Sequence, residues 1–290
     1  MQSVKYARAN TVDEAVSLLS DNGSAYVLAG GTDIIVAARE RTRQVDLFVD
    51  VKHIPEVMAI SFDADAGLTI GAATPCYQLY NNDDIKQHYK CLVDSAVLIG
   101  GTAIQGRASL GGNLCNAGPA ADSIPSLIVL EGVATVAGPN GRREVAAEDF
   151  CTGPGTSILT QGEFVVSLHF PAPKPNSGAR FLRFIPRNEM DIAVVNAAAS
   201  LQLDGDTVTQ ARIAIGAVAP TPLFVTAAGE ALEGKPLSDE TIAAAAAAAR
   251  DAATPIDDMR GSIVQRKHLS GVLTERVIRG AANRARGVEA

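Results

Sequence analysis

Apolar and polar positions in the first fifty residues predict a helix, a strand, a helix and a strand in turn. Residues 11–22, TVDEAVSLLSDN, open with a threonine and gather apolar side chains on one face, as a capped amphipathic helix does. The short apolar run AYVLA at 25–29 predicts a buried strand, and DLFVDV at 46–51 predicts another. Between them, residues 32–42 predict a helix with arginines toward its C-terminal end, where the helix dipole favours cations.

The middle of the chain mixes regular elements with one irregular segment. A strand is predicted at 67–73, helices within 75–87, 90–100 and 123–132, and a hairpin at 133–145 that turns at Pro-Asn-Gly. Residues 100–125 are rich in Gly, Ala, Ser and Asn and show neither the strand nor the helix period. They are too apolar for a disordered linker, so we predict an ordered, buried loop whose backbone N–H groups need partners.

The segment PAPKPNSGA at 171–179 breaks both helix and strand and marks a boundary between two domains. Beyond it the pattern predicts three strands and then helices; the strands lie at 179–186, 191–206 and 207–220, and the helices at 223–234, 238–253 and 261–285. The second of these helices contains seven consecutive alanines and begins at Ser238. A threonine at 241, in place of Glu or Gln, leaves its capping box incomplete on sequence grounds.

Composition narrows the class of protein. A chain of 290 residues with 47% hydrophobic and 20% charged residues suits two globular domains. The net charge of −7 argues against nucleic-acid binding as a main task. No apolar stretch approaches the roughly 18 residues that span a bilayer. The N-terminus lacks the pattern of a secretory signal, so we expect a cytoplasmic protein without a membrane span.

The four cysteines, at 76, 91, 115 and 151, are scattered and form no C-x-x-C pattern. In a leaderless chain this spacing predicts reduced thiols and neither a disulfide framework nor a metal site. The four histidines are isolated from one another as well, so we assign no catalytic residue and no metal ligand in this chain.

LAGGTDI, at 28–34, places two glycines between a predicted strand and a predicted helix. Such a corner points successive backbone N–H groups into one concavity, which suits a diphosphate, and a Cβ would keep a phosphate from the backbone. The segment lacks G-x-G-x-x-G and no P-loop lysine follows it. Alone, it is equally compatible with a tight turn.

ASLGGNLCNAGPAADSIP, at 108–125, is a second run of small residues about eighty positions later. Two such segments can wrap one long, phosphate-bearing ligand from two sides. Two alternatives stay open here, because Asp33 and Asp122 each precede a predicted helix and can serve as its N-cap. Similarly, Arg187 and Asp191 can form a structural ion pair or lie beside a ligand.

The paired glycine segments, with RNEMDIAVVNAA further on, resemble the flavin-binding medium subunit of the molybdenum hydroxylases, which include xanthine and carbon monoxide dehydrogenases. The resemblance covers nearly the whole chain and implies an α+β fold. Residues 1–175 would form a p-cresol-methylhydroxylase (PCMH)-type FAD-binding domain of two α/β lobes. Residues 179–286 would form a C-terminal domain with a three-stranded antiparallel sheet and helices.

The resemblance also implies which residues contact the cofactor. The first glycine segment would cradle the FAD pyrophosphate, the second would contact the diphosphate and ribityl chain, and Arg183 stands where many relatives have lysine near the flavin. The implied cofactor-binding residues are Leu28, Ala29, Gly30, Gly31, Thr32, Asp33, Ile34, Ile99, Ser109, Leu110, Gly111, Gly112, Asn113, Asp122, Val165 or Val166, and Arg183.

By the same resemblance, the chain is an oxidoreductase subunit that holds FAD non-covalently as its only redox cofactor. It implies a small [2Fe–2S] subunit and a large molybdopterin subunit as partners, in a dimer of heterotrimers. Electrons would leave the FAD for NAD⁺, a quinone, oxygen or another carrier. Two alternatives are a self-sufficient flavin reductase of the same superfamily and a nucleotide-binding or assembly module without catalysis.

Overall fold

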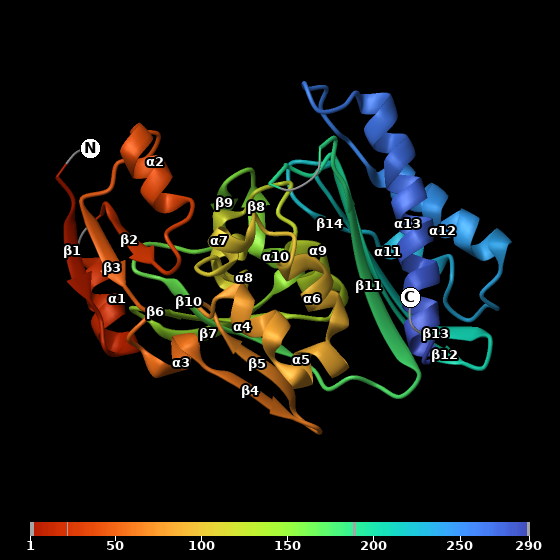
Figure 1. Ribbon diagram of the computed structural model, residues 1–290, viewed down its shortest axis with the longest axis horizontal. Coiled ribbons are helices and arrows are strands. Elements are labelled where there is room, and N and C mark those ends of the chain that lie inside the picture. The colour runs from red at the N-terminus through yellow and green to blue at the C-terminus, as the bar shows by residue number, and fades with distance from the viewer. Residues whose placement is uncertain (1–2, 22, 188–189, 289–290) are drawn as a thin grey trace.

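The computed structural model describes residues 3–21, 23–187 and 190–288. Figure 1 shows three parts in a row: a small N-terminal lobe, a central lobe, and a C-terminal part in which long strands lie against two helices. The first two parts together correspond to the predicted FAD-binding domain.

The N-terminal lobe contains a parallel sheet in the order β1-β3-β2. The two predicted strands are β2 (Ala25–Leu28) and β3 (Leu47–Asp50), and the two predicted helices are α1 (Val12–Ser20) and α2 (Ile34–Glu40). The sequence pattern missed β1 (Lys5–Arg8), a short edge strand that pairs with β3. Because the strands are parallel, their C-terminal ends share the edge where the first glycine segment begins.

The central lobe is built on a five-stranded sheet in the order β4-β5-β10-β6-β7. Its strands are antiparallel, and they are β4 (Ile60–Asp63), β5 (Gly67–Gly71), β6 (Val133–Gly138), β7 (Gly141–Ala146) and β10 (Phe164–Phe170). The predicted hairpin is β6–β7. The helices of this region are α3 (Pro55–Met58), α4 (Cys76–Asn81), α5 (Asp83–His88), α6 (Lys90–Ala96), α9 (Ile124–Val129) and α10 (Ala147–Phe150). A small ribbon of β8 (Cys151–Gly153) and β9 (Thr156–Ser157) completes it.

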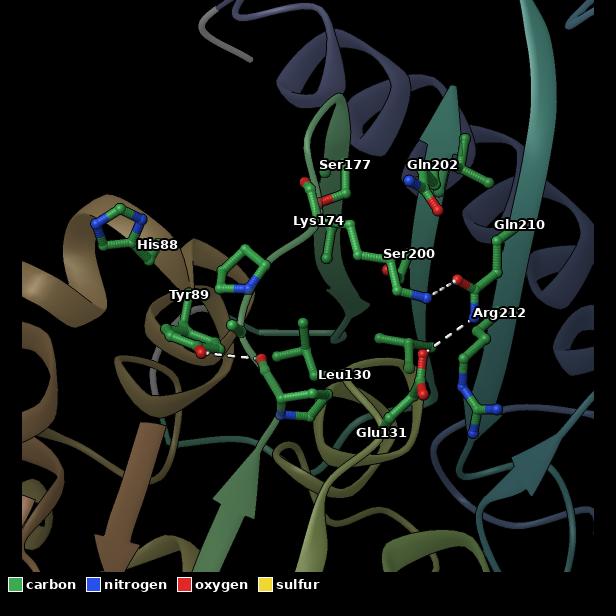
Figure 2. Close-up of a pocket in the computed structure, with 17 residues that line it drawn as sticks. His88, Tyr89, Leu130, Glu131, Lys174, Ser177, Ser200, Gln202, Gln210 and Arg212 are labelled. Atoms are coloured by element: carbon green, nitrogen blue, oxygen red, sulfur yellow. Dashed lines mark hydrogen bonds between the residues drawn. The ribbon is translucent and has the colours of Figure 1, made fainter. Parts of the chain in front are cut away.

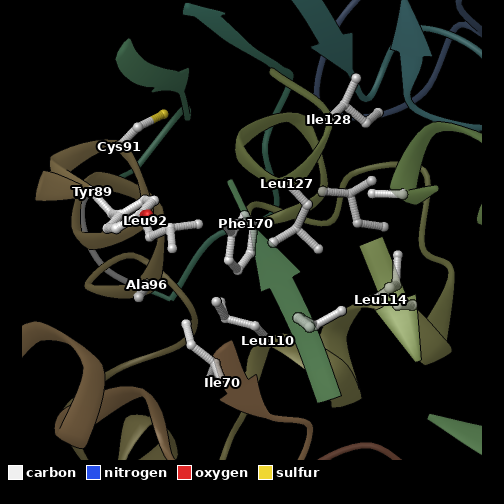
Figure 3. Close-up of a cluster of buried hydrophobic side chains, with 14 of the residues drawn as sticks. Ile70, Tyr89, Cys91, Leu92, Ala96, Leu110, Leu114, Leu127, Ile128 and Phe170 are labelled. Carbon is white, nitrogen blue, oxygen red and sulfur yellow. The ribbon is translucent and has the colours of Figure 1, made fainter. Parts of the chain in front are cut away.

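Strand β10 is the central strand of this sheet, and it joins the cores of the two lobes. Val165 belongs to the large core that also contains Leu110 and Leu114, whereas Val166 belongs to the core of the N-terminal lobe with Val49. Figure 3 shows Leu110, Leu114, Leu127 and Phe170 converging beside the sheet. Val166, Leu168 and Phe170 alternate with Ser167 and His169, which is the pattern of a strand, so the sequence carried a signal for β10 that the prediction did not use.

The prediction of an irregular loop at 100–125 is wrong in part. The segment contains α7 (Thr102–Gln105), α8 (Leu110–Asn116) and the first residues of α9. Helix α8 forms despite two glycines because the Ser109 hydroxyl accepts a hydrogen bond from the Gly112 N–H, and because Leu110 and Leu114 on one face are buried. Tertiary packing here outweighs the weak helix propensity of glycine.

The C-terminal part has the three predicted long antiparallel strands, β11 (Ser177–Phe184), β12 (Val195–Asp204) and β13 (Thr207–Gly216). A two-residue strand, β14 (Leu223–Phe224), is added to this sheet, so the sheet has four strands where three were expected. The helix predicted from 223 therefore begins only at α11 (Thr226–Glu230).

Two long helices follow, α12 (Asp239–Ala252) and α13 (Ile263–Ala285). Helix α13 packs along β11 and β12, while α6 and α9 of the central lobe contact the same sheet, so the sheet lies between the two domains' helices (Figure 1). At the start of α12, Thr241 and Ser238 form a complete capping box, which corrects the expectation that threonine leaves it incomplete. None of the helices in the described part of the chain is long and apolar enough to cross a bilayer.

Candidate functional site

The first glycine segment forms a turn between β2 and α2. Gly31 has a φ of +76°, a left-handed conformation that strains any residue with a Cβ. Asp33 occupies the N-cap position of α2, but its side chain makes no capping hydrogen bond. Among the described residues, the backbone N–H groups of Gly31, Thr32 and Asp33 have no hydrogen-bond partner. The turn therefore presents a row of free donors.

The two glycine segments touch. The Arg107 Nε donates to the Gly30 carbonyl at 2.8 Å. A Cβ on Gly30 would lie 2.1 Å from the Arg107 carbonyl oxygen, so glycine at 30 is required for the approach of the two segments. Glycine at position 30 therefore has a packing role, whether or not it also allows a phosphate to approach.

Within the second segment, only part of the glycine run reaches the surface. A Cβ on Gly111 would lie 2.5 Å from the Ala72 carbonyl oxygen, so Gly111 is required by packing against the end of β5. Gly112 is exposed. The Asn113 side-chain oxygen accepts hydrogen bonds from the Ser123 hydroxyl at 2.6 Å and from the Ser123 N–H at 3.2 Å. Asn113 thereby binds Ser123, the residue that follows Asp122 in the chain.

Asp122 pairs with Arg183 across the boundary between the two domains. The Arg183 guanidinium donates to Asp122 Oδ2 at 2.6 Å, and the two side chains are only 6% and 11% exposed, in that order. Burial raises the pKa of the Asp122 carboxyl to about 6, although the charge of Arg183 acts in the opposite direction. Asp122 does not cap α9, whose N-cap position is Ser123.

Three buried polar atoms beside this pair lack a partner among the described residues. They are Asp122 Oδ1, Arg183 Nε and Asn196 Oδ1. The Asn196 amide nitrogen donates to the Ala121 carbonyl at 3.3 Å, and Arg183 donates to Asp122. All three unpaired atoms therefore belong to side chains that meet at residues 121–122. Buried polar atoms in proteins are almost always hydrogen-bonded, so the unpaired atoms here mark a place where a further polar group, from water or from a ligand, is expected.

The remaining predicted residues are apolar, and the structure places them in or beside the cores. Leu28 is buried at the end of β2, and Ile99 is half-buried in the loop after α6. Val165 and Val166 point into different cores, on opposite faces of β10. The resemblance left a choice between these two, and only Val165 shares a core with the second glycine segment.

The alternative of a structural ion pair holds for two further residues. Arg187 and Asp191, four positions apart, form an ion pair at 3.2 Å in which Asp191 is buried and Arg187 is largely exposed. No described contact connects this pair to either glycine segment.

Sequence reasoning missed Lys52. Its ammonium group donates to the Leu28 carbonyl at 3.2 Å and to the Asp50 carboxylate at 2.7 Å, which also accepts from the Tyr6 hydroxyl. Burial tends to raise the pKa of Asp50, but the hydrogen bonds from Lys52 and Tyr6 outweigh it and hold the pKa below its usual value. The sequence carried a signal for Lys52. This residue directly follows the predicted strand at 46–51, and the C-terminal end of that strand lies at the same edge of the sheet as the glycine turn.

A separate pocket lies where the linker between the domains crosses the central lobe (Figure 2). In it, Lys174 donates to Gln210 at 2.7 Å and Gln210 donates to Glu131 at 3.0 Å, while the Tyr89 hydroxyl donates to the Pro171 carbonyl at 2.9 Å. None of its lining residues belongs to either glycine segment. The pocket is therefore distinct from the predicted cofactor site.

The cysteines are free thiols, as predicted. Burial raises the pKa to about 12 for Cys76, Cys91 and Cys115 and to about 11 for Cys151, so these thiols stay protonated and unreactive near neutral pH. Within residues 3–21, 23–187 and 190–288, no group of three His, Cys, Asp or Glu side chains could hold a metal ion.

Comparisons with known proteins agree with this geometry. Residues 2–173 match the family described as the FAD binding domain in molybdopterin dehydrogenase, and residues 180–281 match the CO dehydrogenase flavoprotein C-terminal domain. The chain is 33% identical over 283 residues to a putative xanthine dehydrogenase FAD-binding subunit of Escherichia coli K12, covering 97% of each chain. It is 30% identical to the carbon monoxide dehydrogenase medium chain of Hydrogenophaga pseudoflava, covering 96% of each.

Solved structures give the same result. The carbon monoxide dehydrogenase structure from Hydrogenophaga pseudoflava superposes with a TM-score of 0.93 at 30% identity, covering 97% of this chain and 98% of the other. The quinoline 2-oxidoreductase structure from Pseudomonas putida 86 superposes with a TM-score of 0.90 at 29% identity, covering 98% of both chains. These matches confirm the predicted α+β fold, the FAD cofactor and the oxidoreductase class. The chain therefore belongs to the family of FAD-binding medium subunits of the molybdopterin dehydrogenases.

Proposed function

We propose that this chain is the electron-transfer subunit of a molybdenum hydroxylase complex. When bound, FAD would supply the redox chemistry, taking electrons from [2Fe–2S] clusters on a partner subunit and giving them to an external acceptor. The protein's own residues bind and orient the cofactor and set its electrostatic surroundings.

The observation that carries the proposal is the contact between the two glycine segments. The bond from Arg107 to Gly30 joins positions 77 residues apart and brings the free N–H groups of the first turn beside the second segment. A tight turn alone needs no such neighbour. Two segments that meet with unpaired donors between them suit a ligand with a diphosphate at its centre.

We assign the predicted residues to parts of the cofactor on this basis. The turn from Leu28 to Ile34 would hold the diphosphate through its free N–H groups. The surface-facing part of the segment from Ser109 to Asn113 would contact the diphosphate and the ribityl chain. Asp122 would accept a hydrogen bond through its unpaired Oδ1, which is buried and has no described partner.

Arg183 is then a residue that acts through Asp122. Its guanidinium is held by the Asp122 carboxylate, so the positive charge that the resemblance places near the flavin is compensated. We propose that Arg183 fixes the orientation of Asp122 and keeps one carboxylate oxygen free for the cofactor. Its Nε is a second unpaired donor at the same place.

The partners belong to the proposal too. The xanthine and carbon monoxide dehydrogenase relatives are named as subunits or medium chains, which favours the interpretation that this chain works in an assembly. We propose a small [2Fe–2S] subunit and a large molybdopterin subunit, assembled as a dimer of heterotrimers. A self-sufficient flavin reductase of the same superfamily is not favoured, because both matched domains are named for molybdopterin or CO dehydrogenases and the relatives are named as medium chains. The free thiols suit a cytoplasmic location.

The purified chain tests the proposal directly. We expect it to bind FAD non-covalently, to show the flavin absorption spectrum, and to release all of its flavin on acid precipitation. Alone, it should reduce an artificial dye from NADH weakly or not at all, and it should hydroxylate no organic substrate.

Co-expression with the products of neighbouring genes provides the second arm of this test. A complex containing iron, labile sulfide and molybdenum, with reducible flavin, supports the proposal. Substrate hydroxylation by the molybdenum-free chain, or a purified chain that neither binds FAD nor recruits other subunits, would contradict it.

A further inference from the structure

We propose that Arg107 is a diphosphate-binding residue that makes the flavin site selective for FAD over flavins without a diphosphate. The inference rests on the proposed function, because it assigns a residue to the same cofactor site. Arg107 lies between α7 and α8, two positions before Ser109, in the stretch that meets the first glycine turn.

The contacts of Arg107 leave most of its donors available. Its Nε donates to the Gly30 carbonyl at 2.8 Å, which fixes the guanidinium against the first glycine turn. A guanidinium has five N–H donors, so four remain on the two terminal nitrogens. Within the described part of the chain, those nitrogens make no hydrogen bond and no ion pair, and the side chain is exposed.

Lys52 provides the contrast. It too is bonded to the first glycine turn, through the Leu28 carbonyl, but its ammonium group is paired with the buried carboxylate of Asp50 at 2.7 Å. Its charge is therefore compensated inside the protein. Arg107 carries a charge at the same turn that no described carboxylate compensates.

A free guanidinium bonded to the turn that carries free N–H groups matches a diphosphate in charge and in hydrogen-bond donors. The planar fork of arginine can donate two parallel hydrogen bonds to phosphate oxygens, which a lysine cannot do. The N–H groups of Gly31, Thr32 and Asp33 lie on the turn that Arg107 contacts. Arg107 thus closes the two segments on each other and adds the positive charge that a doubly charged ligand needs.

This arrangement predicts selectivity as well as affinity. FAD carries a diphosphate, whereas riboflavin carries no phosphate, so only FAD gains from Arg107. Selectivity is a difference between two affinities, and removing Arg107 should lower one and leave the other unchanged.

The experiment measures flavin affinity for the full-length apoprotein by fluorescence titration, with FAD and riboflavin as probes. The variants are Arg107→Gln, Arg107→Lys and the control Arg276→Gln, which removes the same charge from an exposed arginine on α13. We expect Arg107→Gln to weaken FAD binding by about tenfold to a hundredfold. Arg107→Lys should lose less, and Arg276→Gln should bind as the wild type does.

Ionic strength gives a second readout that a purely structural role would not move. FAD affinity of the wild type should fall with added salt, and this dependence should be smaller in Arg107→Gln, because an attraction between charges has been removed. Riboflavin affinity should be equal in all four proteins.

Unchanged FAD affinity in Arg107→Gln would overturn the inference. An equal loss for FAD and riboflavin, or a loss with the salt dependence of the wild type, would overturn it as well, since Arg107 would then act only by joining the segments. A wild-type protein that binds no FAD would instead overturn the proposed function, so the two failures can be told apart.

Discussion

Asp122 illustrates how the surroundings of one buried carboxyl set its chemistry. Burial raises its pKa from 3.8 to about 6, and the nearby Arg183 only partly offsets this effect. The native carboxyl therefore takes up its proton at a higher pH than the unfolded carboxyl does. Its contribution to stability is fully present below a pH of about 4 and is lost as the pH rises through about 6.

This sign leads to a measurable pH dependence. Relative to Asp122→Asn, which does not titrate, the free energy of unfolding of the wild-type apoprotein should fall by about 2 kcal/mol between pH 4 and pH 6, the range set by these two pKa values. Urea unfolding at several pH values, followed by circular dichroism, measures the difference. A constant difference between the two proteins across this range would show that Asp122 is not held in the environment described here.

Residue-level prediction from the sequence reached the right segments but not the contacts between them. Asp122 and Arg183 were both expected near the cofactor, yet nothing in the sequence indicated that they pair with each other at 2.6 Å. Lys52 and Arg107 were missed because each acts on a segment distant in sequence, through a carbonyl oxygen. Local sequence patterns identify glycine-rich turns, whereas hydrogen bonds between side chains and distant segments can be assigned only when the fold is known.

At the scale of elements, the pattern predicted best where one face of an element is exposed. Helix α1 and the β6–β7 hairpin were both found in this way. Strand β10 and helix α8 were missed for different reasons: the alternation of Ser167 and His169 with apolar residues in β10 was available and not used, whereas α8 contains two glycines that obscure its helical period. In α8, burial of Leu110 and Leu114 in the tertiary structure, and not local propensity, determines the element.

Helix α12 depends on its N-terminal cap, because a run of alanines offers little side-chain packing at its ends. The Ser238 hydroxyl accepts from the Thr241 N–H at 3.3 Å, and the Thr241 hydroxyl accepts from the Ser238 N–H at 3.0 Å. We expect Ser238→Ala to lower the free energy of unfolding by about 1 kcal/mol, whereas Ser238→Asp should retain the cap. Urea titrations of the two variants beside the wild type measure this, and equal stabilities of Ser238→Ala and wild type would exclude a contribution from the cap.

At the scale of the whole molecule, the two domains are joined by more than the linker. Asp94 on α6 of the central lobe accepts hydrogen bonds from Arg180 on β11, from Arg284 on α13 and from the backbone N–H of Phe181. The Arg183–Asp122 pair crosses the same boundary. The proposed cofactor site therefore includes residues from both sides of the domain junction, and the docking of the C-terminal domain positions Arg183 against Asp122.

Asp94 allows this docking to be tested without touching the glycine segments. Its side chain is 15% exposed, and that of Arg284, which binds both carboxylate oxygens, is 11% exposed. Removing one partner of a largely buried pair leaves the other charge uncompensated, so Asp94→Ala should lower the free energy of unfolding by about 3 to 5 kcal/mol. The matched control is Glu56→Ala, which breaks an ion pair with Arg142 whose side chains are 44% and 48% exposed. That variant should lose less than about 1 kcal/mol.

Urea unfolding and limited proteolysis of the linker together decide whether Asp94 acts on docking. In Asp94→Ala, the C-terminal domain should unfold at lower urea than the FAD-binding domain, and cleavage within residues 171–176 should become faster, because a loosened docking exposes the linker. FAD affinity should fall as well, since Arg183 no longer holds Asp122 in place. If Asp94→Ala and Glu56→Ala have equal effects on all three measurements, the ion pairs at the junction do not position the C-terminal domain.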